Sequence, residues 1–301
     1  MKIIVTHMSP DWDAITSVWL LKKYLSGWQD AEVRFVPAGQ KFKNQKVTIK
    51  KNGEYPIEKI DGDEVIHVDT GLAPLDHHQT QDKHVCAASL TWEYVLSEFK
   101  EANDTMTAEH KEAVTRIVKV VVDIDHFGEV FWSDAAADRY EFSLIGVLEG
   151  LKYEKQNNDK EYMEFGIGCL NALVAEFENR IWAEQEIKEK GIAFQTSKGS
   201  GMGFETLNDT VLKLAQKMGY QLVVRKDPRK GYVRIKTLPA QGGEDGIDLT
   251  PVYEKLKELD PDATWFLHIS KKMLLNGTPK NPKMVPTKLS LKEIIKVLEK
   301  I

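Results

Sequence analysis

Histidine and aspartate residues recur at four places in the first 125 residues, each beside a short apolar run. They are His7, Asp11 and Asp13; then Asp69; then Asp76, His77 and His78; and finally Asp123 and Asp125. Carboxylate and imidazole groups bind Mn²⁺, Mg²⁺, iron or Zn²⁺, and the excess of carboxylate favours the harder ions. Two such ions about 3.5–4 Å apart can share one carboxylate and bind both oxygens exchanged in a phosphoryl transfer. The pattern predicts a two-metal hydrolytic site.

Each group taken singly also has a purely structural interpretation. Asp11 or Asp13 would cap the start of a helix, and Asp69 would be a turn residue. The histidine pair would lie on the surface, and the last two aspartates would end a helix. Four such coincidences, in order and at the ends of apolar elements, are less expected than one shared site.

Strands and helices alternate in the first half of the sequence. Strands are predicted at residues 2–6, 32–37 and 64–68, a hairpin about Asn52-Gly53 within 46–59, and helices at 14–25, 89–99 and 109–122. Such alternation predicts an α/β fold with a parallel sheet covered on both faces. Ligands bind at the carboxyl edge of such a sheet, and the histidines and aspartates fall at that edge.

A long helix at residues 160–190 is predicted to connect this half to a second one. There the pattern predicts strands at 192–196, 220–225, 231–237 and 264–269, and helices at 205–218, 251–258 and 290–300. The glycine-rich stretch 199–203 lacks the Gly-Lys-Ser/Thr ending of a nucleotide-binding loop, so it is predicted to be a flexible turn. The expected organisation is a catalytic domain at 1–155, a helical connector at 156–190 and a substrate-binding domain at 191–301.

The composition is that of a globular protein, with 42% hydrophobic and 29% charged residues among 301. No apolar run reaches the ~18 residues of a membrane span, and the N-terminus lacks the apolar core of a secretory signal. Two cysteines, Cys86 and Cys169, are too few for a disulfide scaffold, so a reducing compartment, the cytoplasm, is expected.

Charge is unevenly distributed along the chain. The net charge is −5, yet residues 190–301 contain 20 Lys and Arg against 12 Asp and Glu. One interpretation is two solvated surfaces of opposite sign; the other is an acidic half that holds cations and a basic half that attracts an anion.

The four groups of histidines and aspartates resemble the motifs of the DHH phosphoesterase superfamily, which includes family II inorganic pyrophosphatases, RecJ-type exonucleases and nanoRNA phosphodiesterases. The motifs read His7-Met8-Ser9-Pro10-Asp11-Trp12-Asp13-Ala14, Val68-Asp69-Thr70-Gly71, Asp76-His77-His78 with Ala87-Ala88-Ser89 after it, and the acidic end of 120–125. The form Asp76-His77-His78-Gln79 is similar to the melanocyte-proliferating-gene-type (DHHQ) exonuclease branch. Residues 220–239 and 265–277 also resemble that branch.

This resemblance implies a parallel-sheet DHH domain and a smaller α/β C-terminal domain joined by a long helix. It implies that one metal ion is held by His7, Asp11 and Asp69, and another by Asp13, Asp69, His77 and an acid of the fourth motif. Asp125 is preferred over Asp123 as that acid, because the branch has an acid just before its polar-Gly turn. His78 would touch the scissile phosphate. Asp76 would orient the groups around it without contacting the metal ions.

The expected activity is hydrolysis of RNA or short oligonucleotides from an end, with two divalent ions, Mn²⁺ or alternatively Mg²⁺. Anionic substrate would be bound by residues of the basic half: His268, Lys271, Lys272, Arg225, Arg229 and Arg234. Two alternatives stay open, a hydrolase of a small phosphate compound such as pyrophosphate or a nucleotide, and a non-catalytic nucleic-acid-binding protein. The sequence leaves the oligomeric state open and indicates no membrane partner.

Overall fold

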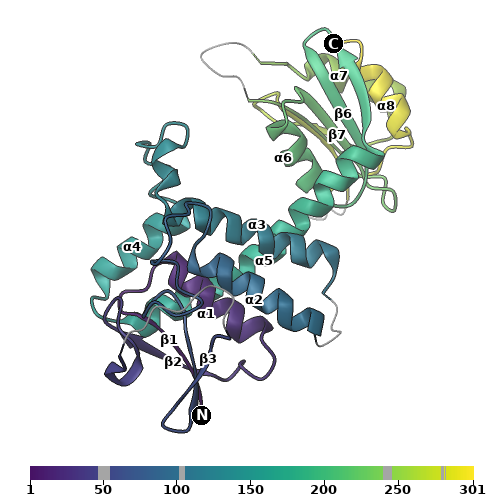
Figure 1. The fold of residues 1–301 in the computed structure, drawn as a ribbon. Helices are drawn as coiled ribbons and strands as arrows, with labels where there is room; N and C mark the ends of the chain where they lie inside the picture. The colour runs from purple at the N-terminus through teal and green to yellow at the C-terminus, as the bar shows by residue number, and fades with distance from the viewer. Residues whose placement is uncertain (47–54, 102–105, 240–245, 279–280, 282) are drawn as a thin grey trace. The chain divides into compact units, whose positions relative to one another are not determined.

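The computed structural model describes residues 1–46, 55–101, 106–239, 246–278, 281 and 283–301 (Figure 1). The chain forms two compact units, Met1–Glu178 and Asn179–Ile301. The helix α5, Asp159–Lys190, contributes residues to both units, and it confirms the long helix predicted at 160–190. No helix within the described ranges is both long enough and apolar enough to cross a membrane.

The first unit contains a four-stranded sheet in the order β2-β1-β4-β3. Its strands are β1 Lys2–His7, β2 Glu32–Val36, β3 Ile57–Ile60 and β4 Asp63–His67. Both neighbours of β1 are parallel to it, whereas β3 runs antiparallel to β4. The predicted parallel sheet and α/β class are therefore confirmed. The turn predicted at Asn52-Gly53 lies outside the described residues.

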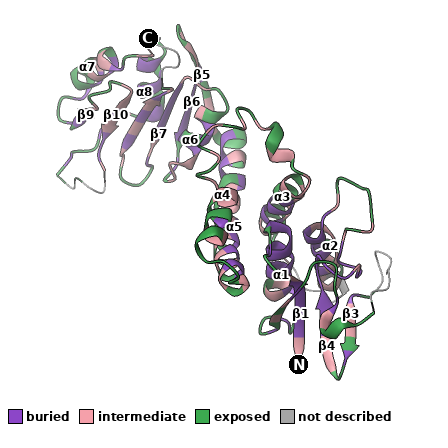
Figure 2. Cartoon of the chain, turned by 90° about the vertical axis from the view of Figure 1, so that its left-hand side faces the viewer, coloured by how far each residue is buried: buried purple, intermediate pink, exposed green. Residues whose placement is uncertain are grey.

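Helices share one apolar core with one face of this sheet. They are α1 Trp12–Tyr24, α2 Ala87–Glu101, α3 Ala108–Asp125, α4 Leu144–Glu154 and the first part of α5, with short 3-10 turns at Phe42–Asn44 and Gly128–Phe131. Ile4, Ile66 and Val68 point into this helical core, and Figure 2 shows that most of β1 and α1 is buried.

The opposite face of the sheet is apolar too, but no α-helix of the described residues packs on it. Ile3, Val5 and Val65 form a small separate cluster there, against which Phe42 packs. The sequence predicted helices on the basis of strand–helix alternation, yet the described cover of this face is a loop carrying one aromatic side chain. A continuous apolar strand such as β1 shows that both of its faces are buried and does not show what buries them.

The second unit contains a six-stranded sheet in the order β5-β6-β7-β8-β10-β9, in which only β6 and β7 are parallel neighbours. The strands are β5 Ile192–Thr196, β6 Gly199–Glu205, β7 Leu222–Lys226, β8 Val233–Thr237, β9 Trp265–Leu267 and β10 Met273–Asn276. The helices are α6 Thr210–Lys217, α7 Thr250–Leu259 and α8 Leu291–Leu298. Helices α7 and α8 share the core of one face, while α6 and the end of α5 cover β6 and β7 on the other.

The glycine-rich stretch 199–203 is a strand, so its prediction as a flexible turn is wrong. A Cβ on Gly201 would lie 2.3 Å from the ring of Phe194, and one on Gly203 would lie 2.7 Å from Ile295 Cδ1. Glycine lets these large side chains pack directly on the strand backbone. The strand continues to Glu205, which is why the helix predicted from 205 begins only at Thr210.

Substituting Gly201 tests this packing. We expect Gly201→Ala to lower stability by about 1–3 kcal/mol, because the added methyl group overlaps the Phe194 ring and a packed core tolerates extra volume poorly. The measurement is the melting temperature by calorimetry. Adding Phe194→Leu to Gly201→Ala should restore part of the loss; a melting temperature unchanged by Gly201→Ala would contradict the close packing.

Candidate metal centre

The sheet brings two of the predicted groups to one edge. His7 is the last residue of β1, and Asp69 follows its neighbour β4 by two residues. Asp69 has a left-handed backbone with φ of 53°, which is uncommon for a residue other than glycine. Its N–H donates to the Leu75 carbonyl at 3.1 Å. This bond closes the loop and returns the chain, so that residues 76–78 lie beside Asp69.

Helix α1 positions the two aspartates of the first motif. Asp11 is its N-cap and accepts the backbone N–H of Asp13 and of Ala14, each at 3.0 Å. Asp13 is buried and accepts the backbone N–H of Ala87 at 2.8 Å and of Ala88 at 2.6 Å, at the start of α2. The capping interpretation of Asp11 is thus correct, and the same carboxylate still has an oxygen that faces His7.

The end of α3 separates Asp123 from Asp125. The helix continues through both residues, and two residues along a helix span about 200° of rotation. Asp125 therefore faces His77, while Asp123 is exposed and accepts the indole N–H of Trp132 at 2.9 Å. The structure brings Asp125 to the other candidate ligands and does not bring Asp123.

Three carboxylates surround the imidazole of His77. Its Nε2 lies 3.6 Å from an oxygen of each of Asp13, Asp69 and Asp125. These distances exceed hydrogen-bond length, and the nearest oxygens of Asp69 (Oδ1) and Asp125 (Oδ2) are buried without any hydrogen-bond partner. Buried acceptors with no donor are costly. Three acidic oxygens around one ring nitrogen are a donor set that suits a divalent cation.

The other oxygen of Asp69 belongs to a second group. Asp69 Oδ2 lies 3.1 Å from His7 Nε2, which also lies 3.7 Å from Asp11 Oδ2. The His7 Nδ1–H donates to the Met8 carbonyl at 2.8 Å, and that bond leaves Nε2 as the nitrogen available to a metal. Ligand atoms of His7, Asp11 and Asp69 lie within 4.8 Å of one another. Asp69 therefore presents one oxygen to each of two groups.

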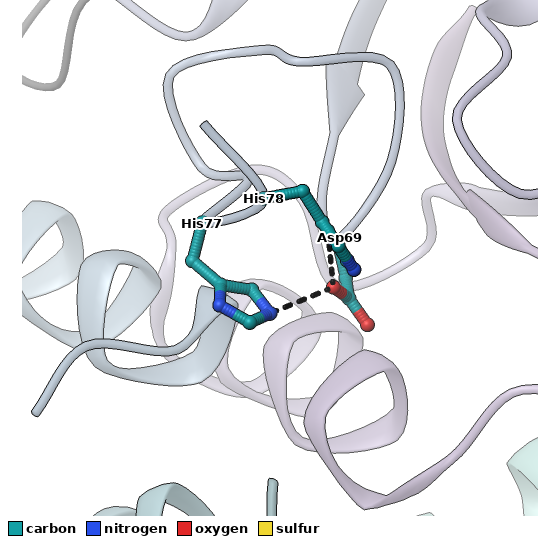
Figure 3. A group of neighbouring side chains, drawn as sticks. All are labelled: Asp69, His77 and His78. Carbon is teal, nitrogen blue, oxygen red and sulfur yellow. Dashed lines mark ion pairs between the residues drawn. The ribbon is translucent and has the colours of Figure 1, made fainter. Parts of the chain in front are cut away.

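A hydrogen bond to Asp76 holds His78 beside Asp69. Its Nδ1–H donates to Asp76 Oδ1 at 2.7 Å, and the same Nδ1 lies 3.6 Å from Asp69 Oδ1 (Figure 3). Asp76 is buried and also accepts the Leu72 N–H at 2.7 Å. The His78 side chain is 60% exposed, so its ring is oriented by the protein and accessible from solvent.

His126 is a neighbour of the site that the sequence reasoning missed. Ligand atoms of His77, Asp125 and His126 lie within 4.8 Å of one another, and the His126 ring meets the His77 ring edge-on. Its Nε2–H donates to the Val85 carbonyl at 3.0 Å. The sequence does place His126 directly after Asp125, and that position was the one indication of its role.

A cavity of about 430 Å³ opens on this edge of the sheet. It is lined by His7, Asp11, Ala38, Gly39, Asp69, Leu72, Asp76, His78 and Asp125. The segment after β2 contributes the apolar wall through Ala38 and Gly39. Candidate ligands from three separate motifs and the oriented His78 thus face one space large enough for a small substrate.

Burial shifts the protonation of the central groups. It raises the pKa of Asp13, of Asp125 and of Asp69, the last to about 6, and it lowers the pKa of His77. Neighbouring carboxylates add to the shift of Asp13, since charges of like sign disfavour one another. The cluster therefore resists full ionisation unless a cation supplies the compensating charge.

The pKa values of His7 and His78 are raised, in contrast to that of His77. Burial lowers the pKa of His7, but the hydrogen bond to Asp69 and the charge of Asp11 outweigh it and raise that pKa to about 9. The hydrogen bond to Asp76 raises the pKa of His78 to about 9. Both imidazoles carry positive charge at neutral pH when no metal ion competes for them.

Comparisons with known proteins match this chain to solved structures but not to protein families or curated sequences. No protein-family model matches the sequence, and a search of curated proteins finds no match. Among solved structures, the chain is similar to RecJ from Thermus thermophilus, crystallised in complex with Mg²⁺, with 11% sequence identity and a TM-score of 0.30. The match covers 99% of this chain and 49% of that one, so the chain spans about half the length of that protein.

The basic residues predicted to bind substrate lie in the second unit, and most of them have internal partners. Asp209 accepts Arg225 Nε at 2.6 Å and also pairs with Arg234, while Lys271 pairs with Asp248 at 3.1 Å. Further contacts are those of Lys272 Nζ with the Ile247 carbonyl at 3.1 Å and of His268 Nδ1 with Ser270 Oγ at 2.8 Å. Arg229 is exposed.

The two raised histidine pKa values predict how the metal-free protein responds to pH. Each imidazole has a pKa of 6.5 when unperturbed and about 9 in the fold. Their stabilising contribution is complete below pH 6.5 and is lost as pH rises through about 9, because the folded state holds the protons more tightly. We expect the melting temperature in chelator to fall over this range.

The control for this pH dependence is His78→Gln, which cannot gain a proton. Its melting temperature should fall less steeply over the same range than that of the parent. Equal slopes for the two proteins would contradict the assignment to His78.

Asp123→Asn and Asp125→Asn form a matched pair at the end of α3. Saturating Mn²⁺ should raise the melting temperature of the parent, since an ion that binds only the folded state stabilises it. We expect Asp123→Asn to keep this increase and Asp125→Asn to lose most of it, as measured by thermal denaturation with and without Mn²⁺. The reverse order would assign the fourth-motif ligand to Asp123.

Proposed function

We propose that the chain is a divalent-metal-dependent phosphoesterase that hydrolyses phosphodiester bonds of RNA or short oligonucleotides. The observation that carries the proposal is the position of Asp69, whose two oxygens face two different groups of candidate ligands. A carboxylate shared by two cations is the central feature of two-metal phosphoryl transfer. The order and spelling of the four motifs, which resemble those of the DHH superfamily and its DHHQ branch, support the same activity.

The residues present fit two ions, and we assign them accordingly. His7, Asp11 and Asp69 would hold one ion, and Asp13, Asp69, His77 and Asp125 would hold the other. Carboxylates dominate both sets, which favours Mn²⁺ or Mg²⁺. When bound, the ions would polarise the scissile phosphate and lower the pKa of a bound water.

Of the other residues of the cavity, His78 would contact the substrate and Asp76 would orient His78. Asp76 fixes the Nδ1–H of His78, which leaves the exposed Nε2 for a phosphate oxygen. The imidazolium form of His78 would bring positive charge to the developing negative charge of the transition state. Asp76 itself is buried and bonded to the Leu72 N–H, so it acts as a positioning residue rather than by contact with substrate.

Residues 179–301 would bind the rest of the substrate. Their excess of positive charge favours a polyanion over a single small phosphate compound. A small-phosphate hydrolase remains the competing activity, because five of the six predicted basic residues already have partners within the second unit.

Asp69→Asn tests the shared carboxylate. We expect the hydrolytic rate to fall about 10²-fold or more, because a neutral amide binds two cations poorly and a main electrostatic stabiliser is lost. The measurement is kcat/KM on a short labelled RNA with Mn²⁺, with folding checked by circular dichroism. Asp123→Asn serves as the control that removes a nearby charge outside the cluster, and a near-normal rate in folded Asp69→Asn would refute the assignment.

Chelation and a substrate panel test the reaction and its substrate class. The parent should hydrolyse RNA in Mn²⁺ and lose that activity in excess chelator. The panel consists of pyrophosphate, a dinucleotide and RNA of increasing length. Full activity in chelator would exclude the metal mechanism, and activity on pyrophosphate alone would establish the small-phosphate alternative.

A further inference from the structure

Half of one face of the second sheet has no apolar core over it among the described residues. On strands β8, β10 and β9 the side chains alternate, and those on one side, Val233, Ile235, Leu274 and Trp265, are buried against α7 and α8. The side chains on the opposite side are Arg234, Lys236, Met273, Leu275 and Phe266. We call these five residues the open face.

No apolar core of its own unit covers the open face, although polar side chains of α6 reach β8: Asp209 pairs with Arg234, and Gln216 donates to the Thr237 carbonyl at 2.8 Å. The apolar core on that side of the sheet comprises residues of α5, α6, β6 and β7 and includes no residue of β8, β9 or β10. Met273, Leu275 and Phe266 belong to none of the apolar clusters of the described residues. All five side chains are at least partly exposed, and Phe266 is 51% exposed.

Strand register places a cation, an aliphatic side chain and a phenyl ring in one row. Leu275 pairs with Arg234 on one side and with Phe266 on the other, while Met273 pairs with Lys236 in the adjacent row. Directly paired residues point to the same side of a sheet, and neighbouring strands are about 4.8 Å apart. A ligand lying across the strands would therefore meet positive charge at one end and an aromatic surface at the other.

Positive charge on this side of the sheet is only partly compensated. Asp209 is shared by Arg225 and Arg234, whereas Lys236 has no ion-pair partner within the described part of the chain. Burial lowers the pKa of Lys236, and the charges of Arg234 and Lys213 lower it further. Lys213 lies exposed on α6. An anion near Lys236 would relieve this repulsion.

We propose that the open face binds a single-stranded oligonucleotide, with a base stacked on Phe266 and phosphates near Lys236 and Lys213. The ligand class rests on the proposed function. A single strand presents a flat base and a negative phosphate at every nucleotide, and aromatic side chains combined with cations are the features that bind it without sequence preference. An acidic side chain would match the charge but offers no flat surface to Phe266, whereas every nucleotide supplies both.

Fluorescence anisotropy on the full chain tests this surface. The probe is a labelled single-stranded RNA of twelve uridines, added in excess chelator so that it is not hydrolysed. Phe266→Ala should weaken binding by about 5- to 150-fold, the range for loss of one stacked base. Lys236→Ala should weaken it too and reduce the log–log salt slope by about 0.7.

Two matched controls lie on the helices of the opposite face. Leu259→Ala removes an exposed apolar side chain from α7, and Lys292→Ala removes an exposed charge from α8. Both should bind RNA as the parent does. The proposal is overturned if Phe266→Ala and Lys236→Ala also bind like the parent, or if Phe266→Ala changes only the oligomeric state, which would make the open face a contact between copies.

Hydrolysis separates this proposal from the proposed function. If the chain binds the RNA through Phe266 and hydrolyses no phosphoester, the open face stands and the phosphoesterase does not. If it hydrolyses a dinucleotide and does not bind the RNA, the open face is refuted and the phosphoesterase stands. If both hold, Phe266→Ala should lower the ratio of kcat/KM for the longer RNA to that for the dinucleotide.

Discussion

The carboxylates of Asp13, Asp69 and Asp125 repel one another, and this repulsion is the main constraint that the rest of the first unit has to overcome. Each of them has an oxygen 3.6 Å from one nitrogen of His77, in a partly buried position where negative charge is costly. Two of these oxygens have no hydrogen-bond partner. The arrangement does not stabilise the metal-free fold. A ligand of positive charge would compensate the repulsion among the carboxylates.

The surrounding structure holds the carboxylates in place against this repulsion. The first N–H groups of α2 bind both oxygens of Asp13, where the positive end of the helix dipole also favours the charge. The bond from the Asp69 N–H to Leu75 holds Asp69 in its left-handed conformation. Gly71 follows in the same turn, where a Cβ would lie 2.8 Å from Lys41 Cγ, so the loop fits closely against its neighbour. Strained backbone of this kind concentrates at functional sites.

Much of the first unit could be predicted because its signals are local. The β-branched runs of β1 and β4 identify buried strands, and parallel pairing then places His7 and Asp69 at the same edge. The choice between Asp123 and Asp125 needs the rotational phase of α3, which the sequence supports only through the family's pattern. His126 gave no signal beyond its position after Asp125. Whether Arg225 and Lys271 are free depends on Asp209 and Asp248, whose contacts depend on tertiary packing.

Where prediction of the second unit was wrong, packing overrode composition. Glycines at 199–203 favour a turn, yet Phe194 and Ile295 need strand backbone without side chains at that place. Strand β10 was not predicted, because its sequence, Met-Leu-Leu-Asn, shows no alternation of polar and apolar residues. The open face became evident only from the register of β8, β10 and β9, which the sequence does not specify.

Anomalous diffraction at the manganese edge, from crystals grown with Mn²⁺, tests the central claim most directly. The account predicts two peaks about 3.5–4 Å apart, one beside His7 and Asp11 and one beside His77 and Asp125, with an oxygen of Asp69 bound to each. Crystals saturated with Mn²⁺ that show no peak among these carboxylates, or a single peak to which Asp69 is not bound, would contradict it.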